Sequence, residues 1–196
     1  IKERNLVPFL DIAYQGFGDG LEEDAQVVRL FAKLDIPMFI SSSFSKSFSL
    51  YGERVGALTV LSASKDEAER VLSQVKRTIR TNYSNPPTHG GTVVSMVLNS
   101  SELFAMWEKE LGEMRDRIRL MRAQLVAKLK EHGATQNFDF VLAQRGMFSY
   151  SGLTQAQVER LRNEHGIYAV NSGRICVAAL NSRNIDAVAK AIAQVL

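Results

Sequence analysis

The sequence predicts an α/β fold in the first half of the chain and a small α+β region in the second half. In the first half, short apolar runs alternate with helical patterns, which is typical of a mostly parallel sheet covered by helices. A long helical pattern follows over 101–132, and beyond it the strands and helices are short. We therefore expect two domains, residues 1–112 and 113–196, joined by this long helix.

Three strands and two helices are expected ahead of the long helix. The run Leu6–Ile12 reads as a buried strand close to the first residue. A buried strand needs neighbours on both sides, so we expect the chain to be the C-terminal part of a longer protein. Acidic residues at 22–24 favour a helix start, and Asn85-Pro86-Pro87 ends the second helix. The expected strands span 6–12, 37–43 and 55–61, and the expected helices span 21–34 and 66–80.

The second half begins with the long helix. Its apolar residues recur at spacings of three and four, but no heptad is sustained, so packing against a core is favoured over a coiled coil. Gly133 suits the residue after its end, and Thr154 and Gly166 suit the two ends of the next helix. A hairpin is expected over 137–142 and 147–152, a helix over 153–165, strands over 167–170 and 174–178, and a last helix over 185–196.

Composition narrows the kind of protein. The chain has 196 residues and a net charge of +3, with basic and acidic residues interleaved, so nucleic acid is not an expected partner. No apolar run approaches the roughly 18 residues of a membrane span, so no membrane association is expected. Cys176 is the only cysteine, which excludes an internal disulfide and favours a cytoplasmic setting. The three histidines lack metal-ligand spacing, so no metal is expected.

Lys46 lies in the most informative stretch of the chain, among hydroxyl groups that directly follow a strand-like run. A lysine amine attacks a carbonyl only when it is unprotonated, and desolvation or a nearby cation favours that form. The hydroxyls around Lys46 (Ser43, Ser45, Ser47 and Ser49) and the guanidinium of Arg54 are groups able to hold a phosphate. We therefore interpret Lys46 as the residue that carries pyridoxal phosphate as a Schiff base. Taken alone, a lysine is more often a solvated surface charge.

Asp11 ends the first predicted strand, at the edge where ligands bind in open α/β sheets. A buried carboxylate needs a partner, and the protonated ring nitrogen of pyridoxal phosphate is such a partner. Tyr14 lies three residues on, with a phenol suited to hydrogen-bond the ring oxygen of the cofactor. Taken singly, a carboxylate that caps a turn and a structural tyrosine are the alternatives.

Two further arginines stand next to turns. Arg174 follows Asn171-Ser172-Gly173 and precedes an apolar strand, where a guanidinium is able to bind a carboxylate through two parallel hydrogen bonds. Arg80 precedes a rigid turn containing Pro86 and Pro87, which presents it outward toward the site of a partner. For each arginine in isolation, an ordinary surface position is the alternative.

Together these segments resemble the C-terminal half of a fold-type I aminotransferase of the aspartate and aromatic amino acid subfamily. The resemblance runs in order along the whole chain. It implies a pyridoxal-phosphate transferase fold, with 1–112 as the C-terminal part of the large, mostly parallel-sheet domain and 113–196 as the small α+β domain. The segments that carry it are DIAYQGF (11–17), SFSK (43–46), LYGERVG (50–56), RTNYSNPP (80–87), GMFS (146–149) and SGR (172–174).

The resemblance implies a role for each candidate residue. Lys46 binds the cofactor and moves a proton between it and the α-carbon of the substrate, while Asp11 pairs with the ring nitrogen and Tyr14 with the ring oxygen. Arg174 binds the substrate α-carboxylate, and Arg80 reaches across the interface of a homodimer with shared active sites to a distal carboxylate. The other candidates are the phosphate-binding residues Ser43, Ser45 and Arg54, and Phe148, which lines the pocket.

The implied function is transamination between an L-amino acid, aromatic or aspartate, and a 2-oxo acid such as 2-oxoglutarate. Arg80 and Arg174 together favour dicarboxylates, whereas the segment 45–52 leans toward aromatic substrates. Family members also carry an upstream phosphate-binding loop, an aromatic residue stacked on the ring and an asparagine near its oxygen, none of which is found in this sequence. Two alternatives stay open: a catalytically silent module that binds pyridoxal phosphate, such as the sensor half of a transcription regulator, and an inactive fragment that lacks half of the site.

Overall fold

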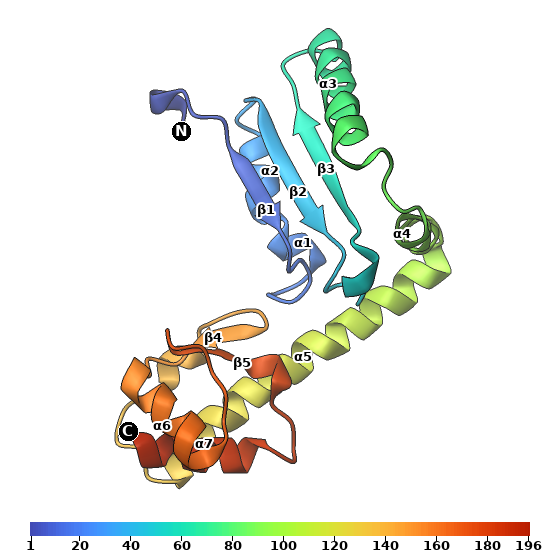
Figure 1. Ribbon diagram of the computed structural model, residues 1–196. Coiled ribbons are helices and arrows are strands. Elements are labelled where there is room, and N and C mark those ends of the chain that lie inside the picture. Colours follow the sequence, from blue (N-terminus) through green and yellow to red (C-terminus); the bar gives the residue numbers. More distant parts are fainter. The chain divides into compact units, whose positions relative to one another are not determined.

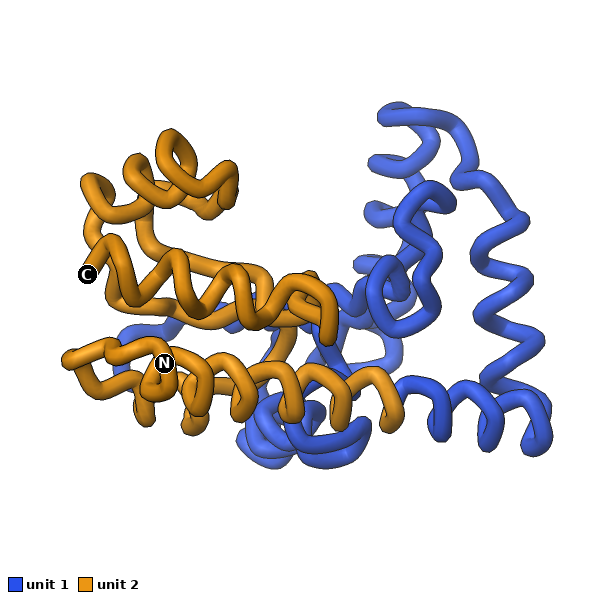
Figure 2. The backbone as a smooth tube through the Cα atoms, turned by 90° about the horizontal axis from the view of Figure 1, so that it is seen from below, with its two compact units in different colours: residues 1–111 blue, residues 112–196 orange.

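The computed structural model describes residues 1–196, which divide into two compact units, 1–111 (unit 1) and 112–196 (unit 2) (Figure 2). The long helix α5 (Ser101–Glu131) contributes to both units, because the division falls after Leu111. The predicted helix 101–132 is confirmed. None of the helices carries an apolar stretch sufficient to cross a membrane.

A three-stranded sheet forms the centre of unit 1 (Figure 1). Its strands are β1 (Phe9–Ile12), β2 (Met38–Ser43) and β3 (Gly56–Leu61), in that order across the sheet. β1 and β2 are parallel and in register, with Asp11 opposite Ser41. α1 and α2 lie on one face of this sheet and connect the two parallel strands (Figure 1).

The direction of β3 differs from the expected parallel sheet. β3 runs antiparallel to β2, with Ser43 opposite Gly56. Parallel strands need a crossover, usually a helix, and the segment between these two strands contains only turns and the short 3-10 helix Tyr51–Glu53. The chain therefore reverses and returns beside β2, and the end of β2 and the start of β3 lie at the same edge of the sheet.

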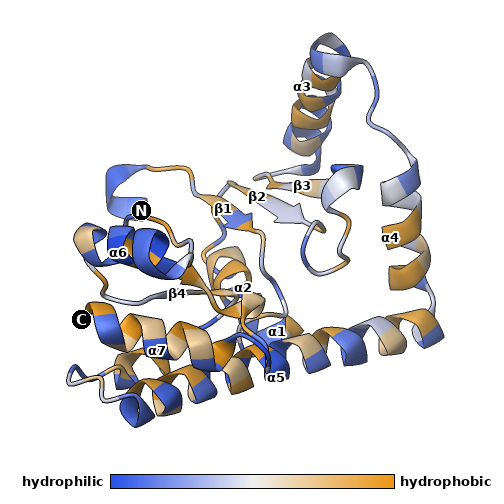
Figure 3. Ribbon diagram, turned by 60° about the horizontal axis from the view of Figure 1, so that its bottom comes forward, coloured by the Kyte–Doolittle hydropathy of each residue, from blue (hydrophilic) through white to orange (hydrophobic).

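The helices of unit 1 are α1 (Leu21–Asp24), α2 (Gln26–Ala32), α3 (Lys65–Tyr83) and α4 (His89–Asn99). The single helix predicted over 21–34 is divided at Ala25. The predicted helix 66–80 is confirmed as α3, which begins at an N-cap Ser64 whose hydroxyl accepts a hydrogen bond from the Glu67 amide. The helix α4 was not predicted, although it is mainly hydrophobic after its first turn (Figure 3).

The strands of unit 1 bury one face more than the other. In β2, Met38 and Ile40 are buried, whereas Phe39 between them is 39% exposed. Phe9 in β1 is 67% exposed, so the first strand is not buried as expected. It is an edge strand, and Phe9 lies on the sheet face on which its neighbour Phe39 is also exposed. A cavity of about 890 Å³ is lined by residues of β3 and α3, among them Leu58, Val75 and Ile79.

Unit 2 packs helices around a two-stranded sheet. The antiparallel strands β4 (Phe148–Tyr150) and β5 (Arg174–Cys176) accompany α6 (Gln155–His165) and α7 (Ile185–Val195). Helices α6 and α7 confirm two predictions. Thr154 and Gln157 form a capping box at the start of α6, and Gly166 ends this helix in a left-handed conformation. Helices α5, α6 and α7 all contribute buried apolar side chains, among them Ile118, Leu125, Leu129, Val158, Leu161, Ile185, Ala189, Ile192 and Val195.

The predicted hairpin over 137–142 and 147–152 is wrong. Residues 139–141 form a 3-10 helix that starts where the Asn137 side chain accepts a hydrogen bond from the Asp139 amide. The strand β4 pairs instead with β5, a partner distant in sequence. The expected strand 167–170 is irregular, and the strand expected over 174–178 ends at Cys176 and continues as the 3-10 helix Val177–Ala179. A fourth 3-10 helix spans Lys2–Arg4.

Candidate active site

The six residues predicted to bind the cofactor all belong to unit 1 and lie at one edge of its sheet. Asp11 is near the carboxyl end of β1, and its Oδ1 accepts a hydrogen bond of 3.3 Å from the Ser41 hydroxyl on β2. Ser43 is the last residue of β2, opposite the start of β3. Arg54 stands two residues before β3, so the strand directions bring it to the same edge.

Lys46 sits in a helical turn that directly follows β2. The Phe48 amide donates to the Phe44 carbonyl and the Ser49 amide to the Lys46 carbonyl, at 3.2 and 3.1 Å. These bonds wind the chain tightly after the strand. The Nζ atom of Lys46 lies over the Tyr14 ring, 4.7 Å from its centroid.

Trp107 of α5 anchors the turn that carries Lys46. Its indole N–H donates a 2.7 Å hydrogen bond to the Ser47 carbonyl. Its ring stacks on Phe48, with centroids 4.5 Å apart, and Phe48 meets Phe44 edge to face. The two residues that flank Lys46, Ser45 and Ser47, are buried. The backbone around Lys46 is therefore fixed by contacts with the long helix.

Asp24 holds the loop that follows Tyr14. The two oxygens of the Asp24 carboxylate accept hydrogen bonds from the amides of Gly16, Gly18 and Asp19, at 2.8 to 2.9 Å. Gly16 has a φ of +92°, and a Cβ atom at this position would lie 2.4 Å from the Leu111 side chain. The loop therefore needs glycine at position 16, and the amides of residues 16, 18 and 19 need an acceptor.

The hydroxyl and cationic groups at this edge suit a phosphate. The Ser43 hydroxyl accepts a 3.2 Å hydrogen bond from the Ser45 amide, and Ser45 is 7% exposed. Arg54 adopts a left-handed backbone conformation and uses its Nη1 to donate to the Tyr51 carbonyl at 2.8 Å. Hydroxyl groups, backbone amides and a guanidinium form the donor set that binds a phosphate dianion. The residues present therefore fit a phosphorylated pyridoxal ring beside Lys46 and Asp11.

The substrate-binding candidates are distributed over both units. Arg80 lies in the last turn of α3, in unit 1, and its guanidinium donates to the Ser84 hydroxyl. Arg174 opens β5 in unit 2, and its guanidinium carbon lies 4.9 Å from the centroid of the Phe148 ring on β4. Gly173 before it has a φ of +81°, and a Cβ there would meet the Leu153 carbonyl at 2.6 Å. Thus only glycine at position 173 lets the backbone just before Arg174 approach the Leu153 carbonyl this closely.

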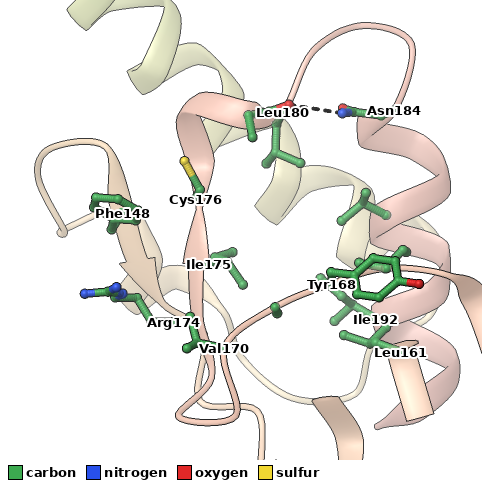
Figure 4. A pocket seen from close by; sticks show the side chains of 14 residues that line it. Phe148, Leu161, Tyr168, Val170, Arg174, Ile175, Cys176, Leu180, Asn184 and Ile192 are labelled. Atoms are coloured by element: carbon green, nitrogen blue, oxygen red, sulfur yellow. Dashed lines mark hydrogen bonds between the residues drawn. The ribbon is translucent and has the colours of Figure 1, made fainter. Parts of the chain in front are cut away.

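A cavity of about 500 Å³ lies beside Arg174 and Phe148 in unit 2 (Figure 4). Figure 4 shows Phe148 and Arg174 together at one side of the two strands, with Ile175 pointing the other way, toward Ile192 and Leu161. The cavity wall behind the strands is largely aliphatic. Arg174 is therefore the cation at this cavity that is available to a carboxylate.

Comparison with known proteins identifies the family. The family model described as aminotransferase class I and II matches residues 1–192. The chain therefore belongs to the class I and II aminotransferases. It is 69% identical to an aspartate aminotransferase of Pseudomonas aeruginosa and 55% identical to an aromatic-amino-acid aminotransferase of Escherichia coli. Each alignment covers all of this chain and 49% of the relative, so the chain spans about half the length of the curated relatives it matches.

Solved structures agree with this assignment and show an α/β aminotransferase fold. An aromatic-amino-acid aminotransferase from Burkholderia pseudomallei, covalently bound to pyridoxal phosphate, is 70% identical with a TM-score of 0.97. A psychrophilic aromatic amino acids aminotransferase from Psychrobacter sp. B6, cocrystallised with aspartic acid, is 51% identical with a TM-score of 0.96. All of this chain is covered in both, against 49% of each solved chain.

Two residues that shape the site were not predicted as part of it. Asp24 reads in the sequence as one of three acidic residues at a helix start, and Trp107 reads as one apolar residue of a long helix. The signal that could have indicated Asp24 is the pair of glycines at 16 and 18, because such loops expose several amides that need an acceptor. Trp107 carries no comparable signal, since its partner lies 60 residues away in sequence.

Proposed function

We propose that the protein is a pyridoxal-phosphate-dependent aminotransferase that transfers the amino group of aspartate and of aromatic L-amino acids to a 2-oxo acid such as 2-oxoglutarate. The proposal concerns the intact protein, because the chain matches about half the length of its relatives. The observation that carries it is the gathering of Asp11, Tyr14, Lys46 and a phosphate-type donor set at one sheet edge.

Pyridoxal phosphate, when bound, supplies an electron sink that stabilises negative charge at the substrate α-carbon. In our proposal Lys46 would hold it covalently through its amine, and, once the substrate amine has displaced the Lys46 amine, the latter would take up and return a proton at that carbon. The Asp11 carboxylate accepts a hydrogen bond from the ring nitrogen, and Tyr14 donates one to the ring oxygen. The phosphate is bound by Ser43, Ser45 and Arg54.

Arg174 is proposed to bind the α-carboxylate that every amino acid and 2-oxo acid substrate carries. Its planar guanidinium matches a carboxylate through two parallel hydrogen bonds. The ring of Phe148 holds this guanidinium on one side and lines the substrate pocket. Arg80 is proposed to bind the second carboxylate of dicarboxylic substrates, from the neighbouring subunit of a homodimer. Its exposed position at the end of α3 supports this role.

The two compact units are proposed to correspond to the C-terminal part of a large cofactor-binding domain (1–112) and to a small domain (113–196). The division of α5 after Leu111 supports this boundary. We place the enzyme in the cytoplasm, as the single free cysteine and a relative titled cytoplasmic aspartate aminotransferase, from Dictyostelium discoideum, suggest. A mitochondrial aspartate aminotransferase from Trypanosoma brucei is also similar, at 45% identity.

Both substrate classes are supported by relatives of similar identity, an aspartate aminotransferase at 69% and an aromatic-amino-acid aminotransferase at 70%. Aspartate carries a charged carboxylate at the end of its side chain, whereas the aromatic substrates carry an uncharged ring there. One site accepts both if Arg80 pairs with a carboxylate and turns outward when an aromatic ring is present. Because Arg80 lies on an exposed helix end next to a turn, such a movement leaves the core undisturbed.

The test is the rate of amino transfer from aspartate, tyrosine and phenylalanine to 2-oxoglutarate by the intact protein, with Lys46→Ala as the control. We expect turnover of aspartate and at least one aromatic substrate, and none by the control. Cofactor binding without turnover would point to the silent module instead. Failure of the intact protein to bind the cofactor at all would refute the proposed function.

A further inference from the structure

Arg122 is a buried arginine of α5 that belongs to none of the groups described above. Its side chain is 3% exposed. Its Nε donates a 3.1 Å hydrogen bond to the Ser149 hydroxyl, and its Nη2 donates to the carbonyls of Gly146 and Phe148, at 2.7 and 3.3 Å. All three acceptors lie on the short segment that leads into β4 and forms its first half.

The surroundings of this guanidinium are electrostatically unfavourable. The three acceptors are neutral, and burial lowers the pKa of Arg122, as do the charges of Arg145 and Arg119 nearby. A buried charge is costly unless it is well hydrogen-bonded. The planar fork of arginine serves two carbonyls and one hydroxyl of this short segment in a fixed geometry. A lysine ammonium lacks this rigid fork, and an apolar residue supplies no donor. The arrangement therefore fixes backbone position, at a cost that a purely apolar contact would avoid.

The segment that Arg122 holds carries the substrate-binding pair. The Phe148 ring lies against the Arg174 guanidinium at 4.9 Å, and β4 pairs with β5 so that Tyr150 is opposite Arg174. The Ser151 amide and hydroxyl both donate to the Gly173 carbonyl, at 3.0 and 2.6 Å, directly before Arg174. Displacement of β4 would therefore move both the ring that Arg174 rests on and the backbone from which Arg174 projects.

We propose that Arg122 is a positioning residue for substrate binding, which holds the segment 146–149 and through it sets the orientation of Phe148 and Arg174. This inference rests on the proposed function, because it takes Arg174 as the group that binds the substrate α-carboxylate. Arg122 does not itself touch the substrate. Its effect is on how well the guanidinium of Arg174 is oriented toward a carboxylate.

The test compares Arg122→Met, Arg122→Lys and Ser149→Ala with the unsubstituted holoenzyme. We expect Arg122→Met to raise KM for the amino acid and for the 2-oxo acid alike by about ten- to hundredfold, the size of one weakened charged hydrogen bond. The Kd of succinate, an unreactive dicarboxylate, should rise equally in calorimetry. The kcat and the affinity for pyridoxal phosphate should stay within about twofold, because the cofactor residues lie in unit 1. Ser149→Ala removes one acceptor, so it should raise KM and the succinate Kd less than Arg122→Met does. The increases in Arg122→Lys should lie between those of Ser149→Ala and Arg122→Met.

Arg160→Met is the matched control. Arg160 pairs with Glu164 and donates to the carbonyls of Val195 and Gln194, so it supports unit 2 without contacting β4. It should lower the unfolding midpoint and leave KM unchanged. Unchanged KM and succinate Kd in a folded Arg122→Met protein would overturn the proposal. If that variant does not fold, unchanged constants in both Arg122→Lys and Ser149→Ala would overturn it. If the unsubstituted protein has no turnover, the proposed function fails, and succinate calorimetry with the same variants still tests the link from Arg122 to Arg174.

Discussion

The Nζ atom of Lys46 lies 4.7 Å from the centroid of the Tyr14 ring. The two residues are far apart in sequence and meet because β1 and β2 are parallel neighbours, so that the loops after both strands leave the sheet at the same edge. Each loop is hydrogen-bonded to a side chain outside it. Trp107 binds the turn that carries Lys46, and Asp24 binds the loop after Tyr14. The position of the catalytic lysine in our proposal therefore depends on contacts that are testable one at a time.

Trp107→Phe should destabilise the protein and loosen the Lys46 turn. Phenylalanine keeps a ring against Phe48 but leaves the Ser47 carbonyl without its donor. A buried polar group left unsatisfied costs about 1–3 kcal/mol. We expect a loss of this size in the free energy of unfolding, measured by urea denaturation, and weaker cofactor binding. The variant Phe104→Leu, next to Trp107 but without a hydrogen bond to the turn, is the control for ring packing. Equal cofactor affinity in the wild type and Trp107→Phe would contradict the anchoring role.

Asp24→Ala should weaken cofactor binding, because three amides of the loop after Tyr14 lose their common acceptor. Asp24→Asn keeps one acceptor oxygen and should have a smaller effect. We expect a loss of about 1–3 kcal/mol in unfolding free energy for the alanine variant, together with a changed absorbance spectrum of the bound cofactor. Glu23→Gln, at the adjacent exposed position, is the matched control. A normal spectrum in a folded Asp24→Ala protein would show that the loop does not need this carboxylate.

Arg80→Ala should separate the two substrate classes. The variant should lose about ten- to hundredfold in kcat/KM for aspartate, the value of one charge-assisted hydrogen bond, and little for phenylalanine. Arg77→Ala, one turn earlier on α3, should leave both unchanged. Arg174→Lys should instead weaken the binding of every amino acid substrate, because the ammonium of lysine does not replace the two parallel hydrogen bonds of a planar guanidinium. Equal losses on aspartate and phenylalanine in Arg80→Ala would count against a role in distal carboxylate binding.

The ion pair between α5 and α7 should give unit 2 a defined acid sensitivity. Hydrogen bonds from Lys128 Nζ at 2.7 Å and from His132 Nε2 at 3.2 Å lower the pKa of Asp186 below its ordinary value. The unfolded carboxyl has a pKa of about 3.9, so the folded state binds fewer protons than the unfolded state near that pH. This contribution to stability is present above about pH 4 and is lost as the pH falls through the folded pKa of Asp186.

Urea denaturation between about pH 3 and pH 7 tests this prediction on Asp186→Asn. The difference in unfolding free energy from the wild type should shrink as the pH falls below about 4. Asp116→Asn, on the same helix as Lys128, is the control, since Arg119 Nη1 lies 3.8 Å from its carboxylate, beyond hydrogen-bond distance. A difference for Asp186→Asn that stays constant over this range would show that the pair contributes nothing that depends on protonation.

The sequence predicted the elements whose signals are local. Thr154 and Gly166 marked the two ends of α6, and the spacing of apolar residues marked α3 and α5. The pairing of the strands was harder to predict from the sequence. The strand β4 was assigned to a neighbour at 137–142, although its partner β5 lies beyond α6, because no local pattern encodes a long-range pairing. The direction of β3 was missed although the connection from β2 is short and contains no crossover helix, a local feature that favours an antiparallel return.

The candidate site followed from residue types that are unusual in their setting, a lysine among serines after a strand and a carboxylate at a strand end. What supports these residues was not visible. Trp107 and Arg122 act on backbone atoms 60 and about 25 residues away, and a carbonyl acceptor leaves no trace in a side-chain pattern. Residues that position others are therefore found only when the fold is known.

The central claim is that the amine at position 46 forms the covalent link to the cofactor. Borohydride reduction of the intact holoenzyme, followed by proteolysis and mass spectrometry, measures this directly. We expect the mass of the reduced pyridoxyl group on the peptide that contains Lys46, and on no peptide of the Lys46→Ala protein. A label on Lys33, Lys65 or any other lysine, or the absence of a label from a cofactor-loaded protein, would contradict the account.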